Sequence, residues 1–280
     1  MKRFATISAA VIGSVLLLSG CGAGAENTVV LGATTSVSDP GLLDELVKVF
    51  EQENGYHVTP VVGGSGDILA RARRGELDVI MTHSPSDEKA FLDDGQGTEP
   101  KEVMENFFVV VGPADDPAGA AASSTLTDAF KAIAAAKAPF ISRGDASGTN
   151  KRELATWASL GIDPKGQPWY QESAVGQGQN VMVASDKGGY TLVDSSTFVS
   201  MQANVQLRPL FTDEDQPNIY TVMVVNPEKH GNVNVNAARA WANFVTGASG
   251  QAVIASFGKD KYGEALFVPL AKAVRDGSSP

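Results

Sequence analysis

The chain is poor in cysteine, in histidine and in basic residues. It has one cysteine and three histidines among 280 residues, and 32 acidic side chains stand against 22 basic ones. A single cysteine excludes an intramolecular disulfide, so core burial alone must stabilise the fold. The histidines show no pair at ligand spacing, which disfavours a metal-cation site. A net charge of −10 disfavours nucleic acid as a partner.

Apolar runs long enough to suggest a membrane segment are confined to the N-terminus. Lys2 and Arg3 precede an uncharged apolar run over residues 4–18, and Leu18-Ser19-Gly20-Cys21 follows. The run is too short to span a bilayer and has the order of an export signal. Its end resembles a bacterial lipobox, in which Cys21 is lipidated. We therefore predict a lipoprotein signal peptide over 1–20, a tether over 21–27, and an exported protein anchored to the cell membrane, facing the periplasm or the exterior.

Strand-like and helix-like segments alternate from Thr28 onward, which predicts an α/β fold. Residues 28–33 form a buried apolar run, and a helical pattern follows from Pro40. Asp39 as N-cap and Gly55 after the last turn are the expected helix boundaries. Further strands are predicted over 56–62, 77–81 and 139–142.

Two similar apolar segments divide the chain. Residues 106–113 and 219–227 each form an apolar strand that ends in a small or polar residue and proline, and a complete α/β block lies between them. This order predicts two Rossmann-like lobes joined by two hinge strands, with a cleft that closes by hinge motion. The predicted ranges are 28–111 and 221–280 for lobe 1 and 112–220 for lobe 2. A single continuous doubly wound domain is the alternative.

The segment Ser142-Arg143-Gly144-Asp145-Ala146-Ser147-Gly148-Thr149-Asn150 leads directly into a helical pattern. Short hydroxyl side chains and glycines at a helix start are typical of an anion site, because the first amides of a helix lack partners. Arg143 adds a permanent charge suited to oxygen-rich anions. A surface ion pair with Asp145 is the other interpretation of Arg143.

Two further polar turns follow predicted strands. Thr34, Thr35 and Ser36 lie after the first strand, and Ser65 lies between glycines after the second. Ligands of open α/β sheets bind at such strand ends. Helix capping and turn formation are the alternatives for these hydroxyls.

Several sequence words together resemble one family, the substrate-binding lipoproteins of bacterial ABC importers, and its tungstate-binding branch in particular. The resemblance covers nearly all of the mature chain, although Ala33 and Val37 stand where that family often has threonine. The matching words are Ala33 to Ser36 with Asp39 to Leu43, Gly64 to Gly66, Asp78 to Ile80 before His83, Phe108 to Pro113, Ala136 to Thr149, and Val225 to His230.

The resemblance implies a two-hinge periplasmic binding protein that captures a tetrahedral oxyanion, tungstate or molybdate, for delivery to a membrane permease. A fully deprotonated oxyanion requires donors only, whereas phosphate carries a proton and requires an acceptor. We expect a monomer, no enzymatic activity and no cofactor. The predicted oxyanion-binding residues are Thr34, Thr35, Ser36, Ser65, Arg143, Ser147 and Thr149.

Four other residues are weaker candidates: His83, Ser84, Asp145 and Ser173. His83 could bind the anion or serve the structure. Asp145 could accept a ligand proton or orient Arg143, and Ser173 could donate or simply cap a helix. Tyr190, Thr191 and Asp194 could line the cleft, but a buried strand explains them equally well.

Three other functions compete with tungstate transport. A phosphate-binding transport lipoprotein would use Asp145 as acceptor. An exported serine hydrolase would use Ser147 or Ser84, but no nucleophile-elbow motif is present. A lipid-anchored sensory subunit would bind the same anion.

Overall fold

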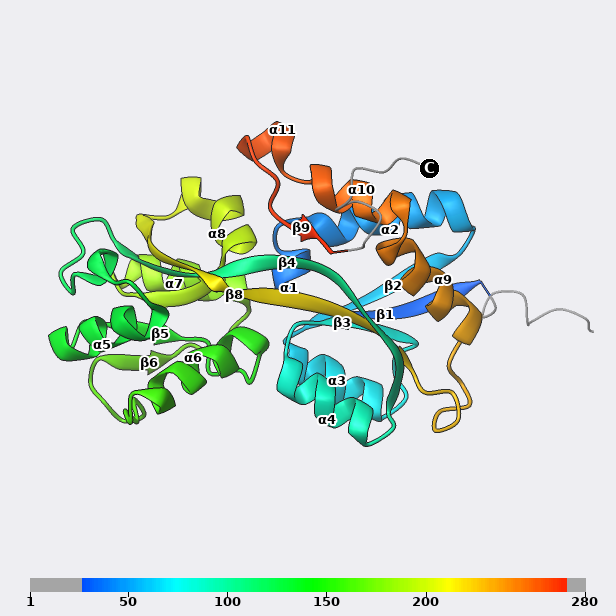
Figure 1. Ribbon diagram of the computed structural model, residues 1–280, viewed down its shortest axis with the longest axis horizontal. Helices are drawn as coiled ribbons and strands as arrows, with labels where there is room; N and C mark the ends of the chain where they lie inside the picture. The colour runs from blue at the N-terminus through cyan, green and yellow to red at the C-terminus, as the bar shows by residue number, and fades with distance from the viewer. Residues whose placement is uncertain (1–26, 271–280) are drawn as a thin grey trace, which may run out of the picture.

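The computed structural model describes residues 27–270 and has two α/β lobes (Figure 1). The predicted signal peptide, Cys21 and most of the tether lie outside the described residues. Two long strands, β4 (Gly97–Pro113) and β8 (Leu207–Val225), run through both lobes as an antiparallel pair. They join the lobes in one seven-stranded sheet of order β2-β1-β3-β8-β4-β7, with β9 (Val268–Pro269) beside β4.

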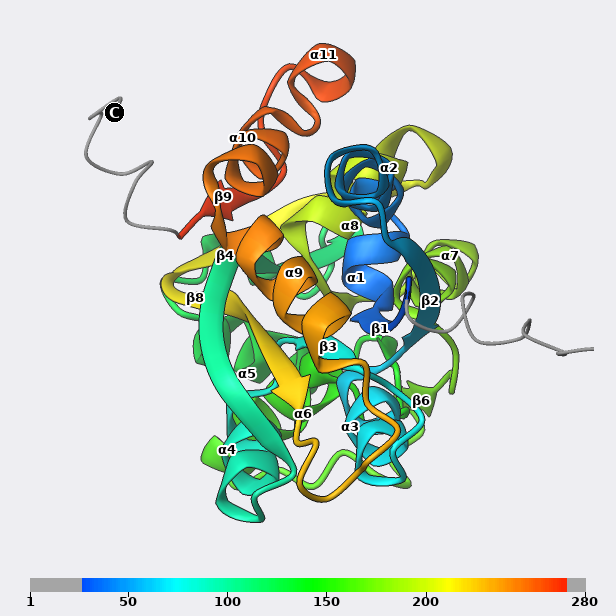
Figure 2. The same cartoon turned by 90° about the vertical axis from the view of Figure 1, so that its right-hand side faces the viewer.

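Lobe 1 is built from both ends of the described chain. Its centre is β1 (Thr28–Thr34), which lies parallel to β2 (His57–Gly63) and to β3 (Val79–Thr82). One face of the sheet packs against α2 (Leu42–Asn54), α9 (Val235–Thr246) and α10 (Ala248–Ser256). The other face packs against α3 (Ser65–Arg73) and α4 (Pro85–Asp93) (Figure 2).

Lobe 2 is built from the middle of the chain. Strand β7 (Thr191–Asp194) pairs with β4, and β5 (Phe140–Ser142) pairs with β6 (Tyr170–Glu172). Helices α5 (Leu126–Ala136) and α6 (Gly148–Ser159) cover one face, and α7 (Gln177–Asp186) and α8 (Ser195–Met201) cover the other. The short elements are α1 (Thr35–Ser38), α11 (Lys259–Tyr262) and two 3-10 turns, Ala120–Ala122 and Gln202–Asn204.

The side chains of β4 show how one strand serves both lobes. Met104 packs in the lobe 1 core, whereas Phe108 and Val110 pack with α5 and Val109 and Val111 with α7 and α8. Alternation along a strand explains the two faces. On β8, Tyr220 already belongs to lobe 1. The predicted divisions at residues 111 and 220 thus lie beyond the points at which the buried side chains change core.

The predicted α/β architecture with two lobes and two hinge strands is confirmed. One helix boundary is wrong: α2 begins at Leu42, after Gly41 in a left-handed conformation with φ 97°, so Asp39 is not its N-cap. The Asp39 carboxylate instead accepts a hydrogen bond from the amide of Gly178 at 2.9 Å. Gly55 caps the end of α2 as predicted. Within residues 27–270, no helix is both long and apolar enough to cross a membrane.

Candidate functional site

The turn after β1 places three hydroxyls at the boundary between the lobes. Thr34 and Ser36 are buried, and their hydroxyl oxygens lie 3.0 Å apart. The Thr35 hydroxyl is also buried but has no hydrogen-bond partner among the described residues. Ala33 and Val37 point into the lobe 1 core. A threonine at either position would therefore place its hydroxyl in apolar surroundings, so the two departures from the family pattern remove no donor from this turn.

Ser65 and His83 complete the lobe 1 side of the site. Ser65 is fully buried as the first residue of α3, and its hydroxyl oxygen accepts the backbone N–H of His83 at 3.4 Å. The hydroxyl proton of Ser65 is therefore left to donate elsewhere. The His83 ring lies between Ser36, with Nε2 to Oγ at 3.2 Å, and Asn218, with Nδ1 to Oδ1 at 2.8 Å.

Burial lowers the pKa of His83 to about 4, and the hydrogen bond with Asn218 opposes this shift only in part. The ring also stacks on Tyr220 with 4.8 Å between centroids. His83 therefore adds no positive charge to the site near neutral pH. Its packing and hydrogen bonds support the structural role that the sequence left open.

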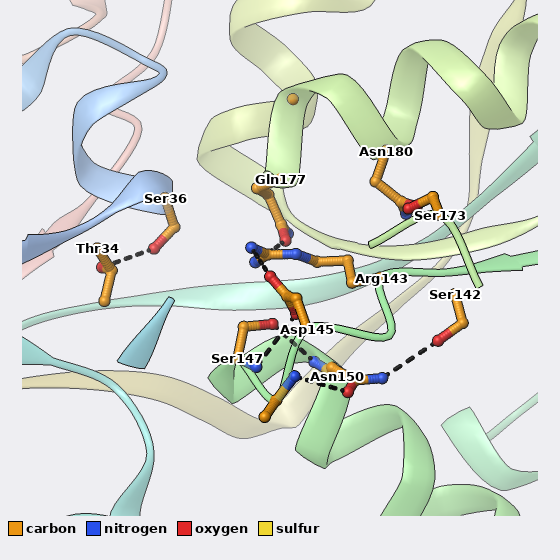
Figure 3. A network of polar contacts seen from close by, with 12 residues as sticks. Thr34, Ser36, Ser142, Arg143, Asp145, Ser147, Asn150, Ser173, Gln177 and Asn180 are labelled. Atoms are coloured by element: carbon orange, nitrogen blue, oxygen red, sulfur yellow. Dashed lines mark hydrogen bonds and ion pairs between the residues drawn. The ribbon is translucent and has the colours of Figure 1, made fainter. Parts of the chain in front are cut away.

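Arg143 supplies the charge of the site from lobe 2. It follows β5, is 2% exposed, and its guanidinium end points toward the turn with Thr34 and Ser36 (Figure 3). Its Nη1 donates to Gln177 at 2.7 Å and its Nη2 pairs with Asp145, while its Nε has no partner among the described residues. Burial lowers the pKa of Arg143, and the charges of Asp145 and Asp194 oppose that shift.

The start of α6 adds two hydroxyls beside Arg143. Ser147 is the N-cap, and its oxygen accepts the backbone N–H of Asn150 at 3.2 Å, which leaves its own proton to donate. The Thr149 hydroxyl is buried and has no partner among the described residues. The positive charge of Arg143, the hydroxyl protons of Ser147 and Thr149, and the start of α6 therefore lie in one region.

The two lobes are in contact around these residues. A Cβ added to Gly148 would lie 2.6 Å from the carbonyl oxygen of His83, and one added to Gly64 would lie 3.2 Å from the Cβ of Ser147. Outside this contact, Lys151 of α6 pairs with Asp87 of α4. All seven predicted binding residues lie at the end of β1, in the turn after β5 or at the starts of α1, α3 and α6.

The weaker candidates have partners of their own. Ser84 donates its hydroxyl to Asp87 at 2.7 Å, and Ser173 donates to Asn180 at 2.6 Å. Asp145 holds Arg143 with one carboxylate oxygen and accepts the backbone N–H of Ser147 at 3.1 Å with the other. These contacts support the orienting role of Asp145.

Sequence reasoning missed several polar residues next to the site. Gln177 bonds Arg143, Asn218 bonds His83, and Asn106 bonds Asn218 at 2.8 Å. Their partners lie 34, 135 and 112 residues away along the chain, and no local motif marks such pairs. Asp194, which the sequence offered as a possible cleft residue, acts as the N-cap of α8.

Comparison with known proteins agrees with this architecture. The PBP superfamily domain matches residues 21–249. The tungstate-binding protein TupA of Peptoclostridium acidaminophilum is 38% identical over 97% of this chain and 99% of its own length. The chain belongs to the PBP superfamily and, within it, to the TupA family.

Two further relatives match most of this chain. TupA of Campylobacter jejuni is 33% identical over 86% of this chain and 90% of its own length. The crystal structure of the tungstate ABC transporter from Geobacter sulfurreducens aligns with a TM-score of 0.76 at 39% identity, over 83% of this chain and 99% of that chain. Both relatives therefore align over nearly their whole length.

Proposed function

We propose that this protein captures tungstate, or its near-equivalent molybdate, between its lobes and delivers it to the permease of an ABC importer. One observation carries the proposal: of the five buried side-chain donor atoms without a partner among residues 27–270, three belong to predicted binding residues from both lobes, namely Thr35 Oγ1, Arg143 Nε and Thr149 Oγ1. Buried donors without partners are costly, and a bound oxyanion would satisfy all three. The TupA relatives from Peptoclostridium and Campylobacter support this choice of ligand.

The donor chemistry of the site favours a deprotonated oxyanion. Beside the three unpartnered atoms, Ser65 and Ser147 each retain a hydroxyl proton because their oxygens accept backbone amides. The nearest carboxylate, Asp145, already accepts from Arg143 and from Ser147. Tungstate and molybdate need donors only, so the site meets their requirement without a free acceptor.

Calorimetric titration of the mature protein tests this function. We expect tight binding of tungstate or molybdate and little heat with sulfate or phosphate. A competition titration of tungstate against molybdate then gives the preference between the two. Absence of binding for both metal oxyanions would overturn the proposal.

Phosphate transport is the second candidate, and Asp145 decides it. A phosphate site needs an acceptor for the ligand proton, and Asp145 is the carboxylate beside Arg143. If the protein binds phosphate, Asp145→Asn should weaken phosphate binding far more than tungstate binding. If Asp145 only orients Arg143, the variant should weaken the binding of both anions by a similar factor.

One arrangement of side chains in the structure resembles that of a serine hydrolase and can be tested by labelling. Ser36, His83 and Asn218 are connected in the order of a nucleophile, a base and an orienting residue. Ser36 is fully buried, however, and the guanidinium end of Arg143 points toward it. We expect no labelling of Ser36 by a fluorophosphonate probe, and stoichiometric labelling would favour hydrolysis instead.

We further propose export and lipid anchoring through Cys21, and a monomeric state. The support for the anchor is the lipobox-like sequence at residues 18–21. Mass spectrometry of the membrane fraction should detect a diacylglycerol on Cys21, and Cys21→Ser should release the protein in soluble form. An unmodified Cys21 in the membrane fraction would contradict the anchor.

A further inference from the structure

A line of buried hydrogen bonds crosses both hinge strands between the two sides of the site. Asn106 on β4 and Asn218 on β8 lie opposite each other in the strand register, and both are buried. Asp194 lies beyond Asn106 in lobe 2, and His83 lies beyond Asn218 in lobe 1. None of the four is exposed by more than 3%.

Asp194 determines which atoms donate and which atoms accept along this line of hydrogen bonds. Its Oδ1 accepts from the backbone N–H of Thr197 at 2.9 Å and from the Ser196 hydroxyl at 2.5 Å, and Asn106 lies 2.9 Å away. A carboxylate can only accept hydrogen bonds. Asn106 must therefore turn its amide nitrogen toward Asp194 and its carbonyl oxygen toward β8.

Donors and acceptors follow the same order across β8 to His83. The Asn106 carbonyl accepts from Nδ2 of Asn218 at 2.8 Å, and that nitrogen also donates to the Tyr220 hydroxyl at 3.2 Å. The Asn218 carbonyl oxygen therefore faces Nδ1 of His83 at 2.8 Å. Because an amide oxygen only accepts, the proton of the neutral ring lies on Nδ1.

The tautomer of His83 determines what Ser36 can do. With the proton on Nδ1, Nε2 is an acceptor, and the Ser36 hydroxyl at 3.2 Å must donate to it. The Ser36 oxygen then accepts from Thr34 at 3.0 Å. Its one proton is used in the bond to His83, so its hydroxyl has none left to donate to an anion.

We propose that Asp194, Asn106 and Asn218 are positioning residues that fix His83 as the Nδ1–H tautomer and keep the Ser36 hydroxyl out of the set that donates to the anion. Asp194 acts on the other side of the site as well. Its Oδ2 accepts from Gln177 Nε2 at 3.1 Å, so Gln177 presents its carbonyl to Arg143 at 2.7 Å. One carboxylate thereby orients both the guanidinium and the lobe 1 hydroxyls. The inference rests on the proposed function for its consequence in binding.

The tautomer can be measured directly by long-range 1H–15N correlation NMR. His57 and His230 bond to Glu51 and Gln96, away from this line, so the double variant His57→Gln, His230→Gln leaves His83 as the single histidine. At pH 7.5, 15N-histidine-labelled protein should show a protonated Nδ1 and an unprotonated Nε2. A protonated Nε2 would overturn the inference whether or not tungstate binds.

Removing one of these hydrogen bonds should change the tautomer of His83. In the single-histidine background, Asn218→Leu removes the acceptor of Nδ1, and the 15N shifts should move toward the Nε2–H form or an average of the two forms. Asn180→Leu is the matched control, because Asn180 is an equally buried amide that bonds Ile141 and Thr191 instead. If Asn218→Leu does not fold, Asn106→Leu serves in its place. Unchanged His83 signals in a folded variant would contradict the role of the hinge amides.

Tungstate titration separates Ser36 from the hydroxyls that donate. Ser65→Ala removes a donor and should weaken binding about tenfold or more, whereas Ser36→Ala should stay within about threefold of the wild type. An equal or larger loss for Ser36→Ala would overturn the inference. If the wild type binds no metal oxyanion, the proposed function fails, and the NMR result still decides the tautomer.

Discussion

The two sides of the proposed anion site differ in what they supply. Lobe 2 contributes the only guanidinium among the described residues that we place at the site, Arg143, held by Gln177 and Asp145. Lobe 1 contributes hydroxyls and a histidine that burial keeps neutral, with its pKa lowered to about 4. Among the described residues that we place at the site, charge therefore comes from lobe 2 alone, whereas both lobes supply neutral hydroxyl donors. The proposed site therefore needs residues of both lobes.

The largest expected effect comes from removing the charge of lobe 2. Arg143→Ala should weaken tungstate binding by about 2–5 kcal/mol, because it removes one partner of a buried charge pair. Isothermal calorimetry measures the loss, and Lys165→Ala is the control, since Lys165 pairs with Glu172 at a largely exposed position. A loss of tungstate affinity below tenfold would contradict the assignment of the positive charge of the site to lobe 2.

The neutral state of His83 in lobe 1 is tested by measuring the free energy of unfolding at different pH values. His83 is ordinarily protonated below about pH 6.5, but its folded pKa is about 4. Between these values the unfolded chain gains a proton that the folded protein does not, so the free energy of unfolding falls as pH drops, by about 3 kcal/mol in all. His83→Gln should remove this part of the decline.

Other buried acids change with pH as well, so the His83 test compares two proteins. Burial raises the pKa values of Asp39, Glu88 and Glu153, which works in the opposite direction. The difference in urea unfolding between wild type and His83→Gln, from pH 7.5 to pH 4.5, isolates His83. Parallel curves would show that His83 is not held neutral.

Closure is tested at Gly148, where the lobes touch. A Cβ at this position would lie 2.6 Å from a backbone oxygen of lobe 1, so Gly148→Ala should oppose closure. We expect weaker tungstate binding by about 1–3 kcal/mol, as for other overpacked contacts. Gly161→Ala is a control without such a contact, although its φ of 67° adds local strain. Small-angle scattering should show a more open Gly148→Ala protein in the presence of tungstate.

Thr35→Val and Thr149→Val compare one threonine hydroxyl donor from each lobe. Each substitution removes one buried hydroxyl that has no partner among the described residues. Each should weaken tungstate binding by about 1.5–3 kcal/mol, typical of a hydrogen bond to a charged group, and leave the melting temperature of the free protein nearly unchanged. If only Thr149→Val matters, lobe 1 does not contact the anion through Thr35.

The smallest effect is expected at the rim between the lobes. Asp87 of lobe 1 pairs with Lys151 of lobe 2, and both side chains are partly exposed. Asp87→Asn should weaken binding by at most about 1 kcal/mol and lose this effect at high salt. A large, salt-independent loss would mean that the rim pair, rather than Arg143, controls closure.

The sequence predicted the elements that depend on local pattern. The strands at β1 and β5, the helix after Ser147 and the hinge segments follow from apolar periodicity and capping residues. Asp39 shows the limit of local rules. It has the sequence context of an N-cap, but Gly41 turns the chain first and Asp39 bonds the opposite lobe instead.

The hydrogen-bonded residues between the lobes were beyond prediction for a physical reason. Asn106 and Asn218 become neighbours only because β4 and β8 pair in one register, which no local signal specifies. The same holds for Gln177, which meets Arg143 only when α7 packs beside β5. Donor residues in strand-end turns and the nearby Asp145 could be proposed from the sequence, whereas the orienting amides Asn106, Gln177 and Asn218 could not.

A crystal structure of the protein with tungstate, measured at a tungsten absorption edge, tests the central claim most directly. The account predicts one anomalous peak between the lobes, within hydrogen-bond reach of Thr35, Arg143 and Thr149, with the Ser36 hydroxyl turned toward His83. A peak outside the contact between the lobes, or one bound by residues of a single lobe, would contradict it.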